Sequence, residues 1–341
     1  MISYLMPLIS GSEQMIVVVG STNFDIVLKV HHLTREGETS SASLLQQYLG
    51  GKGANQAIGV AKLNSKCCFL TSLGNDWAGG FLSNKLSEFD ISLFANRPDD
   101  FSGQAFIEVD DLGVNRIIIY PGANGSLNKD FIDQNSHILS KADLILLQGE
   151  IPWSTNLYIL EKYGNKCPII FDPAPAVPIM LEGIEKATYL TPNESEFSIL
   201  SGRQYKSLEE MIEAARLFQR SIGSTLILKL GENGCAYFSD TESFFVFPIE
   251  GLEVVDTTGA GDSFNSALAV ALESGENIRD AVKFAVLASG ISTMSEGTSS
   301  AMPTGLEVRK LKSKLSENQP ELVDLDDTES YLQYVQYLHK K

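Results

Sequence analysis

Small residues are grouped near the end of the chain, where a phosphate could be held. The run Gly259-Ala260-Gly261 lies between the apolar pair Val254-Val255, which we expect to end a strand, and the apolar, helix-like segment 267–272. Glycines let an anion approach the backbone. The first N–H groups of a helix are unpaired and lie at the positive end of its dipole. The run therefore predicts an anion hole.

Asp262 follows these residues directly, in the expected first turn of the helix. The helix dipole lowers the pKa of a carboxylate at this position, which predicts an ionised Asp262. An ionised carboxylate beside an anion hole can accept the proton of an alcohol, and this combination points to phosphoryl transfer. The simpler alternative is an Asp that only complements the dipole.

A second glycine cluster, Gly50-Gly-Lys-Gly-Ala-Asn-Gln-Ala57, leads into the expected helix 58–63. It lacks the spacing of a Walker A loop, and no G-x-G-x-x-G follows the first strand, which disfavours a nicotinamide dehydrogenase. Lys52, Asn55 and Gln56 supply donors that suit sugar hydroxyls. The cluster therefore predicts a polar ligand site at a helix start.

Asn23 and Asp25 form a polar pair just after the first expected strand. Ligands of open α/β sheets lie at the carboxyl ends of the strands, so we expect this pair to share a pocket with the glycine cluster. For Asn23, a role as a turn residue stays open.

Strands and helices alternate along most of the chain. The helix expected at 207–220 has apolar residues at helical spacing, and Ser207 with Glu210 fits a capping box. This alternation predicts an α/β fold with a mostly parallel sheet covered on both faces. The fold is expected to begin near Met15, after an extension at 1–14. The expected strands of the sheet are 16–20, 144–147, 169–171 and 226–230.

Two segments, 24–50 and 101–124, break this pattern with short alternating strands. We interpret them as a small antiparallel sheet that emerges from the α/β body.

The acidic segment 317–341 is expected to be a solvated tail with a short helix, and a docking helix is the alternative.

Composition limits the classes of protein that fit. Apolar residues make up 43% of the 341 residues, which excludes disorder of the whole chain. A net charge of −17 disfavours nucleic acid and anionic membranes as partners. No run approaches the roughly 20 apolar residues of a membrane span, and no basic segment suggests a secretory signal. The four cysteines lack zinc spacing and predict reduced thiols.

The two glycine motifs together, Gly50–Ala57 and Asp256–Asp262, resemble those of the ribokinase, or PfkB, family of sugar kinases, over about residues 15–315. The resemblance implies a single three-layer α/β/α kinase domain, placed at 15–316, with a β-sheet lid. It implies transfer of the γ-phosphate of ATP to O5 of D-ribose. Asp262 would be the base, and the N–H groups of Gly259, Ala260 and Gly261 the anion hole. The implied sugar pocket contains Asn23, Asp25, Gly51, Lys52, Asn55 and Glu150, although Glu150 could also be an ordinary loop carboxylate.

The resemblance also implies a nucleotide site and two cations. Asn193 and Glu196 match an N-x-x-E motif that holds phosphate and Mg²⁺ through water, and a capping box around Ser195 is the alternative. The nucleotide loop would include Lys229, Gly231 and Gly234, and ATP would also meet Gly261. Lys229 replaces a small polar residue and could contact a phosphate or point outwards. Carbonyl groups proposed for a monovalent K⁺ belong to Asp256, Thr258, Ser292, Ser295 and Gly297.

An exposed lid has open edges and apolar faces, so the resemblance implies a homodimer through the lid. Val109, Ile117 and Ile119 are candidates for burial there, or against the body. A cytoplasmic enzyme is expected, and a nuclear location stays open. Other acceptors remain open too, namely another pentose, fructose or a nucleoside. A sugar-binding regulator without catalysis is the alternative from another class.

Overall fold

Strand β1 (Ile16–Val19) shows why the central sheet is buried on both faces. Val17 and Val19 belong to one hydrophobic core, Ile16 and Val18 belong to a second, and all are fully buried. Successive side chains of a strand point to opposite faces, so an uninterrupted apolar run fits a sheet covered on both sides.

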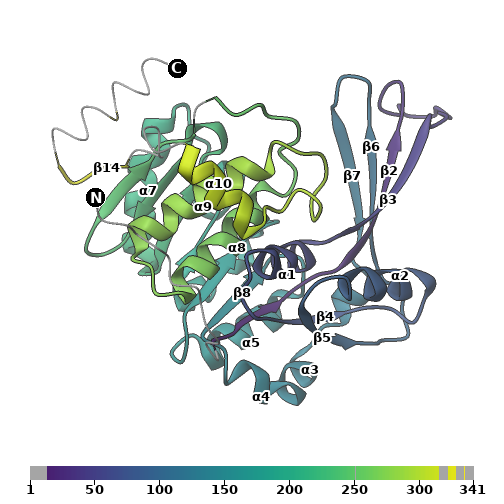
Figure 1. Cartoon of the computed structure of the whole chain (residues 1–341), viewed down its shortest axis with the longest axis horizontal. Coiled ribbons are helices and arrows are strands. Elements are labelled where there is room, and N and C mark those ends of the chain that lie inside the picture. The colour runs from purple at the N-terminus through teal and green to yellow at the C-terminus, as the bar shows by residue number, and fades with distance from the viewer. Residues whose placement is uncertain (1–13, 250, 315–321, 328–333, 335–341) are drawn as a thin grey trace.

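The computed structural model describes residues 14–249, 251–314, 322–327 and 334 (Figure 1). Within them the main sheet contains β1, β4 (Cys67–Ser72), β5 (Ile91–Asn96), β8 (Leu144–Gln148), β9 (Ile169–Asp172), β10 (Tyr189–Leu190), β11 (Thr225–Lys229), β12 (Cys235–Phe238), β13 (Ser243–Val246) and β14 (Leu322–Asp324). Their order is β14-β13-β12-β11-β10-β9-β8-β1-β4-β5. The strands from β5 to β11 in this order pair in parallel, and β12, β13 and β14 are added antiparallel.

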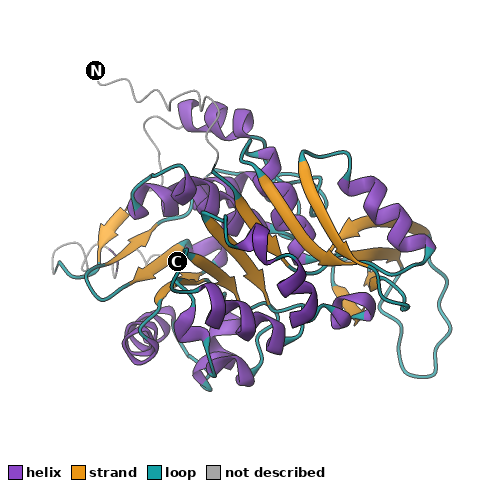
Figure 2. Cartoon of the chain, turned by 90° about the horizontal axis from the view of Figure 1, so that it is seen from below, coloured by secondary structure: helices purple, strands orange, loops and turns teal. Residues whose placement is uncertain are grey.

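Helices cover both faces of this sheet, as Figure 2 shows. One core, which contains Ile16 and Val18, includes residues of α1 (Lys52–Lys62), α2 (Trp77–Leu86), α8 (Ala260–Glu273), α9 (Ile278–Ser292) and α10 (Gly305–Lys314). The other includes residues of α3 (Lys129–Gln134), α4 (Ser136–Leu139), α5 (Trp153–Tyr163), α6 (Glu194–Ser201) and α7 (Leu208–Ile222). The predicted three-layer α/β/α architecture is therefore confirmed.

The predicted helix at 207–220 corresponds to α7, but its expected capping box is only half formed. Ser207 Oγ accepts a hydrogen bond from Glu210 N over 3.2 Å. The Glu210 carboxylate instead accepts one from Lys206 N, one residue before the cap.

A second, smaller sheet projects from the body (Figure 1). Its strands, in spatial order, are β3 (Leu44–Gly50), β2 (Asn23–Lys29), β6 (Gly103–Val109) and β7 (Asn115–Tyr120). The antiparallel prediction is confirmed for β2–β3 and β6–β7, but β2 and β6 pair in parallel. The reason is that β2 and β6 are the first strands of two hairpins that leave the body in the same direction. We call this sheet the lid.

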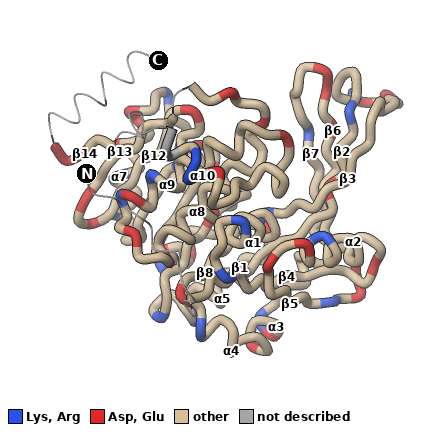
Figure 3. Tube along the Cα trace, viewed as in Figure 1, with Lys and Arg blue, Asp and Glu red and all other residues tan. Residues whose placement is uncertain are grey.

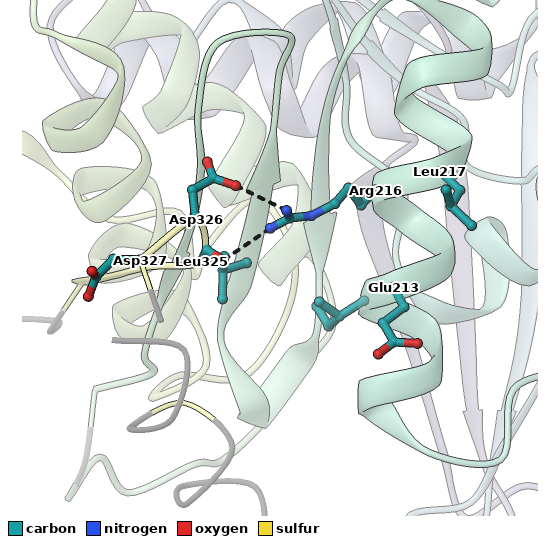
Figure 4. Close-up of a pocket in the computed structure, with 7 residues that line it drawn as sticks. Glu213, Arg216, Leu217, Leu325, Asp326 and Asp327 are labelled. Atoms are coloured by element: carbon teal, nitrogen blue, oxygen red, sulfur yellow. Dashed lines mark hydrogen bonds and ion pairs between the residues drawn. The ribbon is translucent and has the colours of Figure 1, made fainter. Parts of the chain in front are cut away.

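The expectation of a solvated tail is wrong for residues 322–327. β14 pairs with β13, and Val323 and Leu325 are buried. Arg216 of α7 forms an ion pair with Asp326 over 3.0 Å, beside a cavity of about 420 Å³ between α7 and this segment (Figure 4). Val323 and Leu325, two positions apart, therefore point to the same, buried side, and β14 becomes an edge strand of the main sheet. Of the helix expected around residues 331–338, only Tyr334 lies within the described residues; it is helical and fully buried, with its ring 4.7 Å from that of Phe245. The extension at 1–13 lies outside the described residues.

The strand end expected at Val254-Val255 is also wrong. Both residues lie in a loop and are 60% and 54% exposed.

Basic and acidic residues are interspersed along the chain (Figure 3). In the described part of the chain, no helix has the length and apolar character needed to cross a membrane.

Candidate active site

The two glycine motifs meet at the Asp262 side chain. α8 begins after Gly259, whose φ of +80° is a conformation that favours glycine, and Asp262 lies in its first turn. The Asp262 carboxylate accepts hydrogen bonds from Asn55 Nδ2 at 2.9 Å and Gln56 Nε2 at 3.1 Å. The first turns of α1 therefore fix the orientation of the candidate base.

Burial, rather than the helix dipole, dominates the pKa of Asp262. Burial has the largest effect and raises the pKa of Asp262. The Lys52 charge lowers this pKa, the Asp172 charge raises it, and the hydrogen bonds from Asn55 and Gln56 lower it; the net shift is upward. The expectation of a lowered pKa is thus wrong, because desolvation of a buried carboxylate outweighs a dipole effect that is typically about 1 kcal/mol or less. A raised pKa makes Asp262 a stronger proton acceptor.

The start of α1 is built by a close approach of three segments. Gly51 caps the helix with a φ of +90°, and a methyl group there would lie 2.8 Å from Asn23 N, so only glycine fits. Lys52 N and Ser21 Oγ both donate hydrogen bonds to the Glu150 carboxylate, over 3.0 Å and 2.5 Å. Glu150 therefore lies beside the glycine cluster 50–57, which is proposed for the sugar site.

Lys52 is a partly buried ammonium near several carboxylates. Desolvation lowers its pKa, but the charges of Asp262, Asp172, Glu150 and Glu196 raise the pKa by more, so the net shift is upward. Lys52 is therefore charged, and it partly neutralises this group of carboxylates.

Asn23 and Asp25, among the first residues of β2, lie against Gly50 and Gly51 before the start of α1, and both are buried. Asn23 Oδ1 accepts a hydrogen bond from Asn124 Nδ2 at 2.7 Å. Among the described residues, Asp25 Oδ1 has no hydrogen-bond partner. Burial and the nearby Glu150 charge raise the pKa of Asp25 to about 7. An orphaned buried acceptor of this kind fits a ligand that brings hydroxyl donors.

Asn193 and Glu196 form the capping box of α6, so the alternative of a capping box around Ser195 is present and is made by the motif residues themselves. Glu196 Oε2 accepts a hydrogen bond from Asn193 N at 2.8 Å, and Oε1 accepts one from Asn193 Nδ2 at 3.0 Å. Burial raises the pKa of Glu196. The Lys229 charge lowers this pKa and the Asp172 charge raises it, and the net shift is upward. A single carboxylate with both oxygens engaged fits Mg²⁺ that keeps its waters, and not direct ligation.

Lys229 does not point outwards. Its Nζ forms an ion pair with Asp172 Oδ1 over 3.0 Å, and the lysine side chain is only 12% exposed. The following turn closes through a hydrogen bond from Leu230 N to the carbonyl oxygen of Gly234, with Gly231 at a φ of +51°. Lys229 ends β11, and Gly231 and Gly234, which are proposed for the nucleotide loop, follow it in a tight turn.

The segments proposed for K⁺ are joined by a carboxylate. Asp256 accepts hydrogen bonds from Thr258 N and Oγ1 at 2.9 Å and 2.6 Å, and from Gly297 N at 3.0 Å. Ser292 is buried at the end of α9, and Ser295 lies in the loop that follows. The structure brings these segments together, and carbonyl oxygens suit a hard cation. Within the described ranges, no group of three or more His, Cys, Asp or Glu side chains forms a metal site.

Sequence reasoning missed Asp172 and misjudged Gln56. Gln56 Nε2 donates to Asp262 and also to Asp172 Oδ2 over 3.2 Å, so this amide serves two carboxylates and not a sugar hydroxyl. The only signal for Asp172 was its place at the carboxyl end of an expected strand.

A three-layer fold with a lid, and a buried carboxylate beside glycines at a helix start, define the class of α/β phosphotransferases. The model of the pfkB family carbohydrate kinases matches residues 13–305. The chain therefore belongs to the PfkB family of carbohydrate kinases.

Relatives with known names agree with this assignment. The chain is 35% identical to the ribokinase of Bacillus subtilis over 87% of its own length and 99% of that protein. It is 33% identical to a deoxyribokinase of Salmonella typhi, with coverages of 85% and 95%.

Solved structures are also similar. A Thermotoga maritima ribokinase aligns with a TM-score of 0.81 and 42% identity over 88% of this chain and 99% of that one. The Arabidopsis thaliana ribokinase complexed with ribose and ATP aligns with a TM-score of 0.79 and 33% identity, over 87% and 98%.

Proposed function

We propose that this carbohydrate kinase phosphorylates D-ribose at O5 with ATP, giving D-ribose 5-phosphate and ADP. The names of the similar proteins support ribose and ATP as substrates. The observation that carries the proposal is the contact between the motif at the start of α1 and Asp262, because it supports a proton acceptor beside the site proposed for the sugar.

In the proposed reaction, Asp262 takes the proton of the O5 hydroxyl. O5 then forms a bond to the γ-phosphorus, the bond to the bridging oxygen breaks, and ADP leaves with those electrons. The N–H groups of Gly259, Ala260 and Gly261 stabilise the charge on the phosphoryl oxygens. The sugar is held by Asn23, Asp25, Gly51, Lys52, Asn55 and Glu150.

ATP is proposed to lie along the loops beyond β10 and β11. Its phosphates would meet Asn193, Lys229, Gly231, Gly234 and Gly261. The adenine ring would lie against exposed apolar side chains, a role that suits Val254, Val255 and Met294, because exposed apolar surface beside a polar site marks ligand contacts.

Two cations complete the proposal. Mg²⁺ would bind through water near Glu196 and reduce the negative charge of ATP. K⁺ would bind to carbonyl oxygens in the loops joined by Asp256, with ligands drawn from Asp256, Thr258, Ser292, Ser295 and Gly297. When bound, Mg²⁺ supplies charge neutralisation at the phosphates.

The lid is proposed to pair with the lid of a second copy. Ile117 and Ile119 are 50% and 47% exposed, so neither is buried against the body. Their strand partners Ile107 and Ala105 lie opposite Val27 and Asp25 of β2, so this apolar face is continuous with the sugar pocket. A partner lid on this face would cover apolar surface and shield the pocket. We also propose a cytoplasmic location and the kinase boundaries 15–316.

An ADP-release assay over several acceptors tests the proposed function. We expect ATP turnover to depend on added sugar and to have its highest kcat/KM with ribose, compared with deoxyribose, fructose, adenosine and pseudouridine. Deoxyribose is the second candidate, because a deoxyribokinase is among the similar proteins. Preference for another acceptor would overturn the ribose assignment, and sugar-independent or absent turnover would overturn the kinase proposal.

A further inference from the structure

A buried ion pair lies beside the proposed anion hole. Lys229 Nζ is 3.0 Å from Asp172 Oδ1, and the two side chains are 12% and 2% exposed. A methyl group on Gly261 would lie 3.4 Å from Lys229 Nζ, so the ammonium is a neighbour of the anion hole. The pair thus has a position in which a cation could reach a phosphoryl group.

The backbone holds both residues at the same edge of the sheet. Asp172 ends β9 and Lys229 ends β11, with β10 between them in parallel pairing. Lys229 N donates a hydrogen bond to the carbonyl oxygen of Pro192 over 2.9 Å. Strand pairing and this hydrogen bond hold the backbone of Lys229, so the side chain is the part of the residue that can reach a ligand.

Asp172 connects this cation to the candidate base. Its Oδ2 accepts a hydrogen bond from Gln56 Nε2 at 3.2 Å, and the same amide nitrogen donates to Asp262 Oδ1 at 3.1 Å. Gln56 Oε1 in turn accepts a hydrogen bond from Gln148 Nε2 at 2.8 Å. If the Gln56 amide were flipped, its nitrogen and oxygen would exchange places and these bonds would be lost. Asp172 therefore holds two groups, the Gln56 amide and the Lys229 ammonium.

A positive charge is needed here because carboxylates are concentrated around the start of α1. Asp262, Asp172, Glu150 and Glu196 all act on the partly buried Lys52. An incoming triphosphate would add more negative charge, and backbone N–H groups alone carry only partial charges.

We propose that Lys229 is a catalytic cation that contacts a non-bridging oxygen of the phosphoryl group during transfer, and that Asp172 is the positioning residue that holds Lys229 and Gln56. This inference rests on the proposed kinase function. Asp172 keeps the ammonium beside Gly261 before ATP arrives, and Lys229 then exchanges this partner for the phosphoryl oxygen. The bonds that form and break remain those of transfer to the acceptor, with the proton on Asp262.

The test compares Asp172→Asn, Lys229→Met and the double variant with wild type, using the acceptor that wild type phosphorylates best. The double variant leaves no buried charge unpaired, so it is the member of the set most certain to fold. The exposed pair Asp133–Lys162 is the matched control, changed to Asn and Met in the same way. Thermal unfolding, kcat and both KM values are measured for each protein.

We expect Lys229→Met to lower kcat by about 100-fold, the usual effect of losing one donor to a developing oxyanion. Asp172→Asn should lower kcat by about tenfold although Lys229 is present, with the sugar KM unchanged, since it disturbs positioning only. The double variant should unfold near the wild-type temperature and stay within about threefold of Lys229→Met in kcat, because the residues act as a unit. The control pair should leave kcat unchanged.

A folded double variant with wild-type kcat would overturn the proposal, because a purely structural pair can be removed without loss of activity. The positioning role would be overturned if the kcat loss of the double variant equalled the product of the two single losses. It would also be overturned if Asp172→Asn changed only the sugar KM. A wild-type preference for another acceptor would contradict only the ribose assignment, since the comparison is made relative to wild type.

Discussion

Asn55 Nδ2 donates a hydrogen bond to Asp262 Oδ2 over 2.9 Å, between residues 207 positions apart in the chain. The donor belongs to the helix that begins with the proposed sugar motif, and the acceptor is the proposed base. The proposed sugar site and the proposed base therefore share one contact between α1 and α8. Catalytic geometry of this kind depends on small displacements, because misplacement of about 1 Å can cost about 100-fold in rate.

The anion hole can be tested with a single methyl group. Gly261→Ala should fold, because the methyl would be in ordinary contact with Lys229 Nζ at 3.4 Å, but it should lower kcat by about 100-fold by occupying the place of a phosphoryl oxygen. Gly80→Ala in α2 is the matched control, because it also replaces a helical glycine and meets nothing within 4 Å. Equal kcat values for the two variants, measured by ADP release, would argue against an anion hole at Gly261.

The raised pKa of Asp25 predicts a pH-dependent sugar affinity. With a pKa of about 7, Asp25 of the free enzyme loses its charge as the pH falls, and a neutral carboxyl is a poorer acceptor for sugar hydroxyls. We expect kcat/KM for the sugar to fall about tenfold per pH unit below 7, and this fall to disappear in Asp25→Asn. An unchanged pH profile in the variant would show that another group titrates.

The raised pKa of Asp25 also predicts that this residue lowers the stability of the fold at neutral pH while it supports sugar binding. The folded pKa is raised, so its contribution to stability is complete below pH 3.8 and is lost as the pH rises to about 7. Asp25→Asn should therefore raise the free energy of unfolding by roughly 1–3 kcal/mol at pH 8, while weakening sugar binding. Urea unfolding at pH 8 and pH 4 checks this, and a larger gain at pH 4 would contradict it.

The loops joined by Asp256 predict activation by a monovalent cation. Replacing K⁺ with tetramethylammonium at constant ionic strength and constant Mg²⁺-ATP should lower kcat, because a large organic ion cannot be held by backbone carbonyl oxygens. A titration of kcat against K⁺ measures the effect. Equal rates in the two salts would remove the proposed site.

The lid face that contains Ile117 and Ile119 predicts a dimer. Lysine at both positions should shift the protein from dimer to monomer in sedimentation, because the substitutions bury charges in an apolar contact. Ile118→Lys is the control, because Ile118 is 65% exposed on the opposite face of the same strand. A dimer in the double variant, or a monomeric wild type, would contradict pairing through this face.

Short motifs predicted the part of the site that local chemistry determines. Asp262 and Asn55 could be singled out because glycines and a polar residue at a helix start have a recognisable pattern, and the structure brings the two side chains together. Asp172 could not be found in this way, since its partners depend on which strands become neighbours. Val254-Val255 was misread because an apolar pair resembles a strand end even when it faces solvent. β14 was missed because its short apolar pattern lies among acidic residues.

The central claim is that Asp262 accepts the proton of the sugar hydroxyl, and Asp262→Asn tests it most directly. Asp280→Asn is the matched control, because Asp280 is also the third residue of its helix, α9. With ribose and ATP, we predict that kcat of Asp262→Asn falls by about 1,000-fold while thermal unfolding stays near wild type, and that Asp280→Asn keeps the wild-type kcat. A folded Asp262→Asn with near wild-type kcat would contradict the account.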